Sequence, residues 1–494
     1  MELFVLGIQN VFQPTCLILI FLGTFFGIIF GAIPGLTATM GVALLIPFTF
    51  TMSAIEGTAL LIGVFIGGIS GGLISASLLR MPGTPSSVAT TFDAYPMVKN
   101  GQAGLALGIG IFSSVFGGIV TSFGLALIAP QVVKIALKFG YFEYFSLGIF
   151  ALTIVVTLAK GTMIKGLLAA CFGLLFSFFG AAPVDMTYRF TFGLNSMKGG
   201  FSLLPVLIGL FAISQIMTEI LNPSEVLVPK VDTKNILPPL SIFTKDWKNL
   251  IRSTLIGFFI GILPGIGSAT SNIVAYGQAK QNSDHPEKFG TGYAPGIIAS
   301  EASNNATTGG ALIPLITMGI PGDGVTAIML GGLMIHGLHP GPLLFQYNPD
   351  LVNSIFVSVF LANIFMFIIM IIGIRFLILV LKTPKKYLLP VILILCIVGA
   401  FALNNRMFDV WSLFLFGIIG FMLEKLKFPL TPLILGIVLG PIIEINIRQG
   451  LMASSGSFLP IFTRPISLVF IILSILSVIL PIYLEKKKKM IFQP

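Results

Sequence analysis

The chain has 494 residues, of which 55% are hydrophobic and only 9% are charged, and its mean hydropathy is +1.02. Soluble domains carry roughly 25% charged residues, so this composition excludes an ordinary soluble protein. The net charge of +10 is better explained by lysine-rich cytoplasmic loops of a membrane protein than by a nucleic-acid-binding surface.

Apolar runs of about 20 residues recur along the chain, and each is long enough to cross the hydrocarbon core of a bilayer. The first covers residues 15–33, and residues 36–50 after it are too short to cross alone and suit a half-helix. A glycine-rich run follows at 57–79, and residues 102–221 supply about four more spans. We predict an all-α polytopic membrane protein with roughly 12–14 membrane segments, some of them broken or re-entrant.

A polar, proline-containing stretch with five basic residues, 222–252, divides the chain and predicts a cytoplasmic linker. The first transmembrane half is then residues 1–221, with a first repeat at about 15–130. The second half is residues 253–494, with a second repeat at about 253–345 followed by C-terminal helices.

Two Pro-Gly breaks interrupt the apolar segments of each half. The string Gly31 to Gly35 in the first half is matched by Gly261 to Gly265 in the second. Further along, Pro82-Gly83 is matched by Pro321-Gly322, and a glycine pair precedes each. Proline removes a backbone hydrogen bond, and non-helical backbone persists in a bilayer only where protein or a water-filled cavity covers it. The duplicated breaks therefore predict a polar site inside the membrane.

Loop charges predict the orientation of the two repeats. The lysine-rich segment 485–489 should be cytoplasmic, whereas the lysine-poor loops 339–350, 404–409 and 444–463 should be external. The first repeat follows residues 1–15, which contain no Lys or Arg, and so starts outside; the second follows the basic linker and starts inside. Inverted-topology repeats with broken helices are typical of secondary transporters, which bind substrate near the midplane.

Backbone groups and hydroxyls at the breaks are the candidate substrate ligands. A helix kink or a close interhelical contact is the alternative interpretation of each break, but duplication beside Ser, Thr and Asn favours a site. The predicted substrate-binding residues are Pro34, Gly35, Thr37, Thr39, Pro82, Gly83, Thr84, Ser86, Ser87, Pro264, Gly265, Ser268, Asn304, Asn305, Pro321 and Gly322.

Carboxylates and hydroxyls near these segments are the candidate ligands of a coupling ion. Carboxylates inside a membrane usually mark ion or proton paths, although each could instead cap a helix at a loop edge. The abundance of neutral oxygen ligands favours Na⁺ over H⁺. The candidates are Asp93, Glu301, Thr307, Thr308 and Asp323.

Motifs of metal and nucleotide chemistry are absent from the sequence. The three cysteines are isolated within apolar runs, so small core residues are the simplest interpretation. The three histidines form no HExxH-type zinc pattern, and there is no Walker A loop. We therefore expect that the chain is not an enzyme and needs no cofactor, with Na⁺ as the candidate coupling ion.

In their order and spacing, these motifs resemble the large permease subunit, called TctA, of the tripartite tricarboxylate transporter family. The resemblance covers nearly the whole chain. The segments that carry it are residues 31–35, 82–93, 95–96, 99–104, 263–267, 285–290, 301–306, 309–314 and 319–322.

The resemblance implies a multi-pass protein of a prokaryotic inner membrane that imports small tricarboxylates or dicarboxylates, driven by a Na⁺ or H⁺ gradient. It also implies two partners, a small TctB-like membrane subunit and an extracytoplasmic TctC-like solute-binding protein. Asp323 follows the last Pro-Gly pair where relatives carry a small residue, so the preferred substrate charge could differ from that of citrate. A passive channel, or a transporter for another small polar solute, is the alternative.

Overall fold

The computed structural model describes residues 2–158, 163–221 and 232–491. Helices dominate the described chain, where the strands are two short segments, β1 (Gly180–Ala181) and β2 (Tyr188–Arg189). Within the described residues, eight helices are long and apolar enough to cross a membrane, and five shorter apolar helices accompany them. These findings confirm the predicted all-α polytopic membrane protein.

The first half opens with the broken pair that the sequence predicts, because Pro34-Gly35 separates two helices. The hydroxyl of Thr37 starts the second of these by accepting a hydrogen bond from the Met40 amide at 3.2 Å. The elements of this half are α1 (Glu2–Val11), α2 (Pro14–Ala32), α3 (Ala38–Thr49), α4 (Ala54–Leu79), η1 (Pro85–Ser87), α5 (Thr90–Lys99), α6 (Ala103–Ala136), α7 (Tyr141–Leu158), α8 (Met163–Ser177), β1, β2, η2 (Asn195–Met197), α9 (Leu203–Ile208), η3 (Gly209–Ile213) and α10 (Ser214–Leu221).

The second half repeats the broken pair around Pro264-Gly265, and its first long helix begins at Trp247, inside the stretch 222–252 predicted as a linker. Residues 222–231 of that stretch lie outside the described residues. The elements are α11 (Ser241–Lys245), α12 (Trp247–Ile262), α13 (Gly267–Gln281), η4 (Pro286–Lys288), α14 (Ala294–Met318), α15 (Gly324–Ile335), α16 (Pro342–Tyr347), α17 (Pro349–Val380), α18 (Lys385–Asn404), α19 (Met407–Lys425), α20 (Leu430–Ala453), α21 (Pro460–Thr463) and α22 (Pro465–Ile491).

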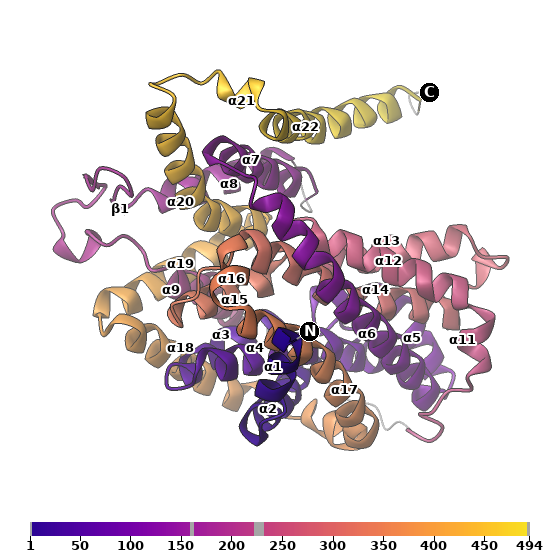
Figure 1. The fold of residues 1–494 in the computed structure, drawn as a ribbon. Coiled ribbons are helices and arrows are strands. Elements are labelled where there is room, and N and C mark those ends of the chain that lie inside the picture. Colours follow the sequence, from indigo (N-terminus) through magenta and orange to yellow (C-terminus); the bar gives the residue numbers. More distant parts are fainter. Residues whose placement is uncertain (1, 159–162, 222–231, 492–494) are drawn as a thin grey trace.

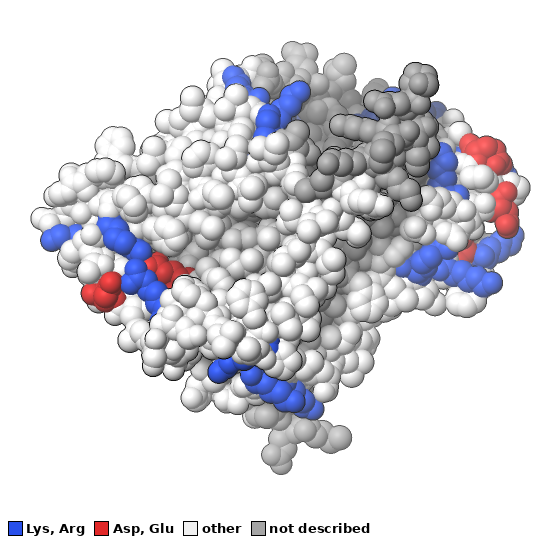
Figure 2. Space-filling view, turned by 90° about the horizontal axis from the view of Figure 1, so that it is seen from above, with Lys and Arg blue, Asp and Glu red and all other residues white. Residues whose placement is uncertain are grey.

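Charged side chains are unevenly distributed over the surface. Figure 2 shows mixed acidic and basic groups at the left and right ends of the view, smaller basic groups above and below, and a broad uncharged area between. Large apolar side chains are exposed on many of the helices, including Leu127, Ile372 and Trp411. A bilayer supplies the apolar surroundings that such a surface needs.

Each repeat contains one pair of helices that packs closely through glycines, and the pattern is the same in both repeats. Gly27 and Gly31 of α2 lie so close to α4 that a Cβ atom on either would overlap a backbone carbonyl oxygen. Gly257 and Gly261 of α12 lie equally close to α14. Small residues allow such backbone contact between membrane helices. The repeated Gly-x3-Gly spacing therefore reflects two helix pairs that pack in the same way.

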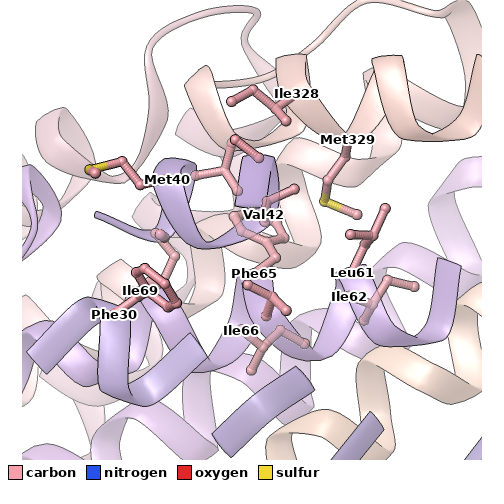
Figure 3. Close-up of a cluster of buried hydrophobic side chains, with 14 of the residues drawn as sticks. Phe30, Met40, Val42, Leu61, Ile62, Phe65, Ile66, Ile69, Ile328 and Met329 are labelled. Atoms are coloured by element: carbon pink, nitrogen blue, oxygen red, sulfur yellow. The ribbon is translucent and has the colours of Figure 1, made fainter. Parts of the chain in front are cut away.

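The two halves interleave rather than forming separate bodies. Helix α4 of the first half packs against α17 of the second, and α14 of the second packs against α6 of the first. Figure 3 shows one part of the shared core, where Ile328 and Met329 of α15 lie near Met40 of α3 and Leu61 of α4. The core is therefore built across the two repeats.

A small hairpin that the sequence did not predict projects from the bundle near α20 (Figure 1). Arg189 of β2 donates two hydrogen bonds to Glu444 of α20, at 2.7 and 2.9 Å. Arg448 pairs with the same carboxylate at 3.0 Å and with Asp185 at 3.1 Å. Hydrogen bonds from Thr187 and Arg448 hold the pKa of Asp185 below its usual range, so this ion pair persists at neutral pH.

We expect Glu444→Ala to release the hairpin from α20. The substitution leaves Arg189 without its bidentate partner, which costs about 2 kcal/mol for a charge-assisted pair. Hydrogen–deuterium exchange of the peptide that contains Tyr188 should accelerate, while exchange in α14 stays unchanged. The matched control is Glu287→Ala, which removes an exposed contact of 3.4 Å with His285 and should leave the hairpin as it is. Equal exchange in both variants would show that the hairpin is held by other contacts.

Candidate functional site

One small cavity of about 170 Å³ is lined by residues that lie next to each of the four Pro-Gly breaks. Its wall is formed by residues 37–39 and 84–86 from the first half and by residues 265–269 and 323–325 from the second. The packing is crossed between the halves. Helix α3, after the first break of its half, packs on α15, and α13 packs on η1. Each half therefore supplies both kinds of break to the wall.

Three helices begin at this cavity. The first residues of α3, α13 and α15 all line it, and none of its lining residues is Lys, Arg or His. The first backbone N–H groups of a helix lack intrahelical partners, and the helix dipole makes this end positive. The cavity can therefore attract an anion through backbone groups alone, as helix N-termini do in phosphate and carboxylate sites.

The start of α13 is the most open of the three. Thr37 and Asp323 cap α3 and α15 with their side chains, whereas no side chain caps α13 at Ile266. Gly265 and Gly267 have φ values of +70° and +67°, which place the chain in the left-handed region that glycine tolerates. No side chain therefore competes with a ligand for the first backbone amides of α13.

Hydroxyl groups from the first half form part of the cavity wall. Thr84 Oγ1 and Ser86 Oγ form a hydrogen bond of 2.6 Å, and both side chains are almost fully buried. Ser87 lies behind them and donates to the Thr84 carbonyl oxygen at 3.0 Å. Thr39 and Ser268 complete the set of predicted hydroxyl residues that line the cavity.

Asp323 is the only carboxylate among the lining residues. Its Oδ1 accepts hydrogen bonds from the amide and the hydroxyl of Thr326, both at 2.8 Å, and so caps α15. A structural cap and a ligand for a cation are compatible, because the side chain lies at the cavity wall. The carboxylate that follows the last Pro-Gly pair therefore lies at the candidate site.

Other predicted ligands shape the cavity from behind its surface. Gly83 lies against the Gly31 carbonyl oxygen, Gly322 against Ala311, and Gly35 against the Glu219 carboxylate. Larger residues at Gly83 and Gly322 would force these segments apart, because the nearest atoms that they meet belong to backbone. The predicted residues outside the lining are Pro34, Gly35, Pro82, Gly83, Ser87, Pro264, Asn304, Asn305, Pro321 and Gly322, together with the ion-ligand candidates Asp93, Glu301, Thr307 and Thr308.

The amides of α14 join the two halves rather than lining the cavity. Asn305 Oδ1 accepts a hydrogen bond of 2.5 Å from Ser70 of α4, and Asn304 Nδ2 donates to the Ile69 carbonyl oxygen at 3.4 Å. Thr307 shares a hydrogen bond of 2.7 Å with Ser271, and Thr308 donates to the Asn305 carbonyl oxygen. These contacts are interhelical and local, and a ligand role for the four residues stays a prediction.

Asp93 holds a loop of the opposite half. Its Oδ1 accepts hydrogen bonds from the amides of Gly290, Gly292 and Tyr293 at 2.8–3.0 Å, and its Oδ2 accepts one from the Tyr276 hydroxyl at 2.9 Å. The side chain is fully buried. This arrangement gives Asp93 a structural role, while its part in ion coupling stays a prediction.

Asn272 of α13 links Ala89 of the first half to α14, a role that was not predicted from the sequence. Its Oδ1 accepts a hydrogen bond of 2.7 Å from the Ala89 amide, and its Nδ2 donates to the Ser300 carbonyl oxygen at 3.2 Å. The available signal was its spacing, because Ser268, Ser271 and Asn272 recur at i, i+3 and i+4 and so share one helix face.

Comparisons with known proteins match the chain to one family and to relatives from one organism. A family model described as "Tripartite tricarboxylate transporter TctA family" matches residues 17–435. An "Uncharacterized 52.8 kDa protein in TAR-I ttuC' 3'region" of Agrobacterium vitis is 33% identical over 462 residues, which are 94% of this chain and 92% of the relative. An "Uncharacterized protein in TAR-II ttuC' 3'region" of the same organism is 32% identical over 238 residues, 48% of this chain and 98% of the relative. No solved structure matches the chain.

Proposed function

The chain belongs to the tripartite tricarboxylate transporter TctA family, and on that premise we propose that it is the permease subunit that carries small organic carboxylates through the cavity at its four breaks. The observation that supports this most directly is the convergence of three helix N-termini on a cavity without basic side chains. Such a site binds an anion by oriented dipoles and can release it again, as a carrier must.

The substrate is held by both halves in this proposal. Its carboxylate accepts hydrogen bonds from the first amides of α13. Thr84 and Ser86 share one hydrogen bond, and the hydroxyl of this pair whose proton is left over donates to the carboxylate from the other side. Thr37, Thr39 and Ser268 are the further hydroxyl donors.

Asp323 gives a reason for coupling to a cation. A carboxylate substrate that enters beside Asp323 places two negative groups in one small cavity, and this repulsion is strong where water is scarce. A cation that binds between them removes the repulsion, so each ligand raises the affinity of the other. We propose that a Na⁺ or H⁺ gradient drives uptake, and that a cation held at Asp323 would add to this linkage.

Subunits and location follow the family. Tripartite transporters of this family work with other subunits. We propose a TctB-like membrane subunit and a TctC-like solute-binding protein as the partners of this chain, in a prokaryotic inner membrane with the C-terminus in the cytoplasm. Transport families act by binding and conformational change, which is consistent with the prediction that the chain is not an enzyme.

A reconstitution experiment tests the proposal. The chain and its small membrane subunit are placed in proteoliposomes, the solute-binding protein is added outside, and uptake of radiolabelled citrate, succinate and malate is followed. We expect saturable accumulation of at least one carboxylate above its external concentration when a cation gradient is imposed. Flux that only equilibrates the two sides would identify a channel instead, and transport of none of the three would reject carboxylates of this class.

A further inference from the structure

A second buried polar cluster lies outside the cavity, where α14 packs on α5 and α6. Its centre is Glu301 of α14, which is fully buried. Glu301 Oε1 accepts a hydrogen bond of 2.5 Å from Thr90 of α5, and Oε2 accepts one of 2.9 Å from Ser114 of α6. The carboxyl group belongs to the second half and both hydroxyls to the first. The cluster is therefore a contact between the halves whose strength depends on the state of one carboxyl group.

Glu301 differs from the other buried carboxylates in what surrounds it. Asp93 is bound by three backbone amides, and Asp323 caps a helix. Within the described residues, no Lys, Arg or His forms an ion pair with Glu301. Isolated buried charge costs several kcal/mol unless it is paired. Three further buried carboxylates each have an arginine: Glu143 with Arg464, Asp409 with Arg406 and Glu444 with Arg189.

The hydroxyls around Glu301 can also accept a hydrogen bond from its carboxyl group when that group is protonated. Thr90 Oγ1 lies 3.3 Å from Ser300 Oγ, and Ser300 Oγ donates to the Ile297 carbonyl oxygen at 3.1 Å. A protonated Oε1 could therefore donate to Thr90, which would donate to Ser300, and the series ends at a backbone acceptor. Every group in it keeps a partner whether or not the proton is present, which a site that loads and releases a proton requires.

We propose that Glu301 is the proton-binding residue of this transporter, separate from the substrate cavity and placed at the contact between its two halves. The inference rests on the proposed transport function and names the coupled ion and its site. The proton arrives from water on one side, binds the Glu301 carboxylate, and leaves to water on the other side after the halves have moved. This differs from the Na⁺ preference that the neutral ligands in the sequence suggest.

Other ionisable groups on the elements packed against α14 are engaged elsewhere. Asp93 of α5 and Tyr276 of α13 bind each other beside Gly296, about 7 Å before Glu301 along the helix axis. Arg252 of α12 donates to Asn249. Glu56 of α4 is bound by Ser53, and His336 forms a hydrogen bond with Thr49. The ammonium group of Lys99 lies over the ring of Tyr95 in α5. The remaining ionisable side chains are exposed, and they are Lys134, Lys248, Lys280 and Tyr347.

The cluster is connected to the cavity through the start of α5. Thr90, which binds Glu301, follows Ser86 of the cavity wall by four residues. The Ala89 amide between them is bound by Asn272 of α13, the helix whose N-terminus faces the cavity. Binding of a proton to Glu301 changes its hydrogen bond with Thr90. This change can reach both Ser86 and the start of α13, which line the cavity from the two halves. This connection lets the proton and the substrate influence each other without contact.

Transport assays with Glu301→Gln test the inference, because glutamine keeps the shape of the neutral carboxyl group and cannot exchange a proton. In proteoliposomes, an inward proton gradient should raise wild-type uptake about tenfold and leave the variant unstimulated. Exchange of labelled for unlabelled substrate, which needs no net proton movement, should continue in the variant. Glu56→Gln, at the exposed start of α4, is the control and should respond like the wild type. A variant that keeps the proton response, or a wild type driven by Na⁺ alone, overturns the proposal.

Infrared spectroscopy decides the matter without any substrate. A protonated carboxyl group has a C=O stretching band that glutamine and carboxylate lack, so the wild-type protein should show a pH-dependent band that Glu301→Gln has lost. Thr90→Ala should keep the band and shift its frequency, since Thr90 is its hydrogen-bond partner. An unchanged band in both variants overturns the assignment of the proton to Glu301. A lost band in a protein that moves no carboxylate would support the proton site while rejecting the proposed substrate class.

Discussion

Replacing Gly267 by alanine is expected to lower the proposed carboxylate uptake about tenfold, because the left-handed backbone at this position costs any other L-residue roughly 1–2 kcal/mol. Gly267 has φ of +67° at the start of α13, and an added Cβ atom would lie 2.9 Å from the Cβ of Asp323 at the cavity wall. The helix start must therefore move or narrow the cavity. Uptake into proteoliposomes and binding of the substrate to purified protein measure the loss.

The same helix supplies the matched control. Gly277 of α13 has no atom within 4 Å of an added Cβ, so Gly277→Ala meets no obstacle. Alanine is a better helix former than glycine by up to about 1 kcal/mol, and this variant should keep full uptake and gain a little thermal stability. Normal uptake by Gly267→Ala, at wild-type expression and stability, would mean that the cavity is not the substrate site.

Asp93→Ala is expected to cause the largest loss of stability. The carboxylate receives four hydrogen bonds in a fully buried place, and its removal leaves three backbone amides and a tyrosine hydroxyl without an acceptor. Each unsatisfied buried group costs about 1–3 kcal/mol, so a total of about 3 kcal/mol or more is expected. The melting temperature in detergent should fall, and trypsin should cut faster at Lys288 in the released loop.

Two further substitutions separate the role of Asp93 from a general charge effect. Tyr276→Phe removes a single hydrogen bond and should cost about 1 kcal/mol. Asp284→Ala changes an exposed carboxylate of the same loop and should leave both melting and trypsin cleavage unchanged. Should Asp93→Ala melt like the wild type yet lose gradient-driven uptake, Asp93 would belong to the ion path and its structural role would be minor.

Much of the fold could be predicted from the sequence because its signals are local. The length of an apolar run limits where a helix can span, and a Pro-Gly pair ends one helix whatever surrounds it, so α2, α3 and the copy at α12 and α13 appear where expected. Helix α12 begins at Trp247, within the stretch that is predicted as a linker from charges such as Lys248 and Arg252. The hairpin was missed because its strands have two residues each, too few for an alternating pattern.

The candidate site could be predicted only in part. Thr37, Thr84 and Ser268 were identified because they stand next to a break, and the structure places all three on the cavity wall. Asn304 and Asp93 have partners far away in the sequence, Ile69 and residues 290–293, and some of these partners are backbone groups that no side-chain pattern reveals. Such contacts depend on how helices cross, which a single sequence does not specify.

The contacts of Glu301 in α14 with α5 and α6 have a consequence for biosynthesis. A ribosome completes the first half well before the second, so Thr90 and Ser114 enter the membrane without the carboxylate that later binds them. Buried hydroxyls without partners are costly in hydrocarbon, and they favour an intermediate kept near the insertion machinery or a chaperone until synthesis ends. We therefore expect quality-control proteases to recognise a failed chain in the interval after the first half is inserted and before α14 packs against α4 and α6.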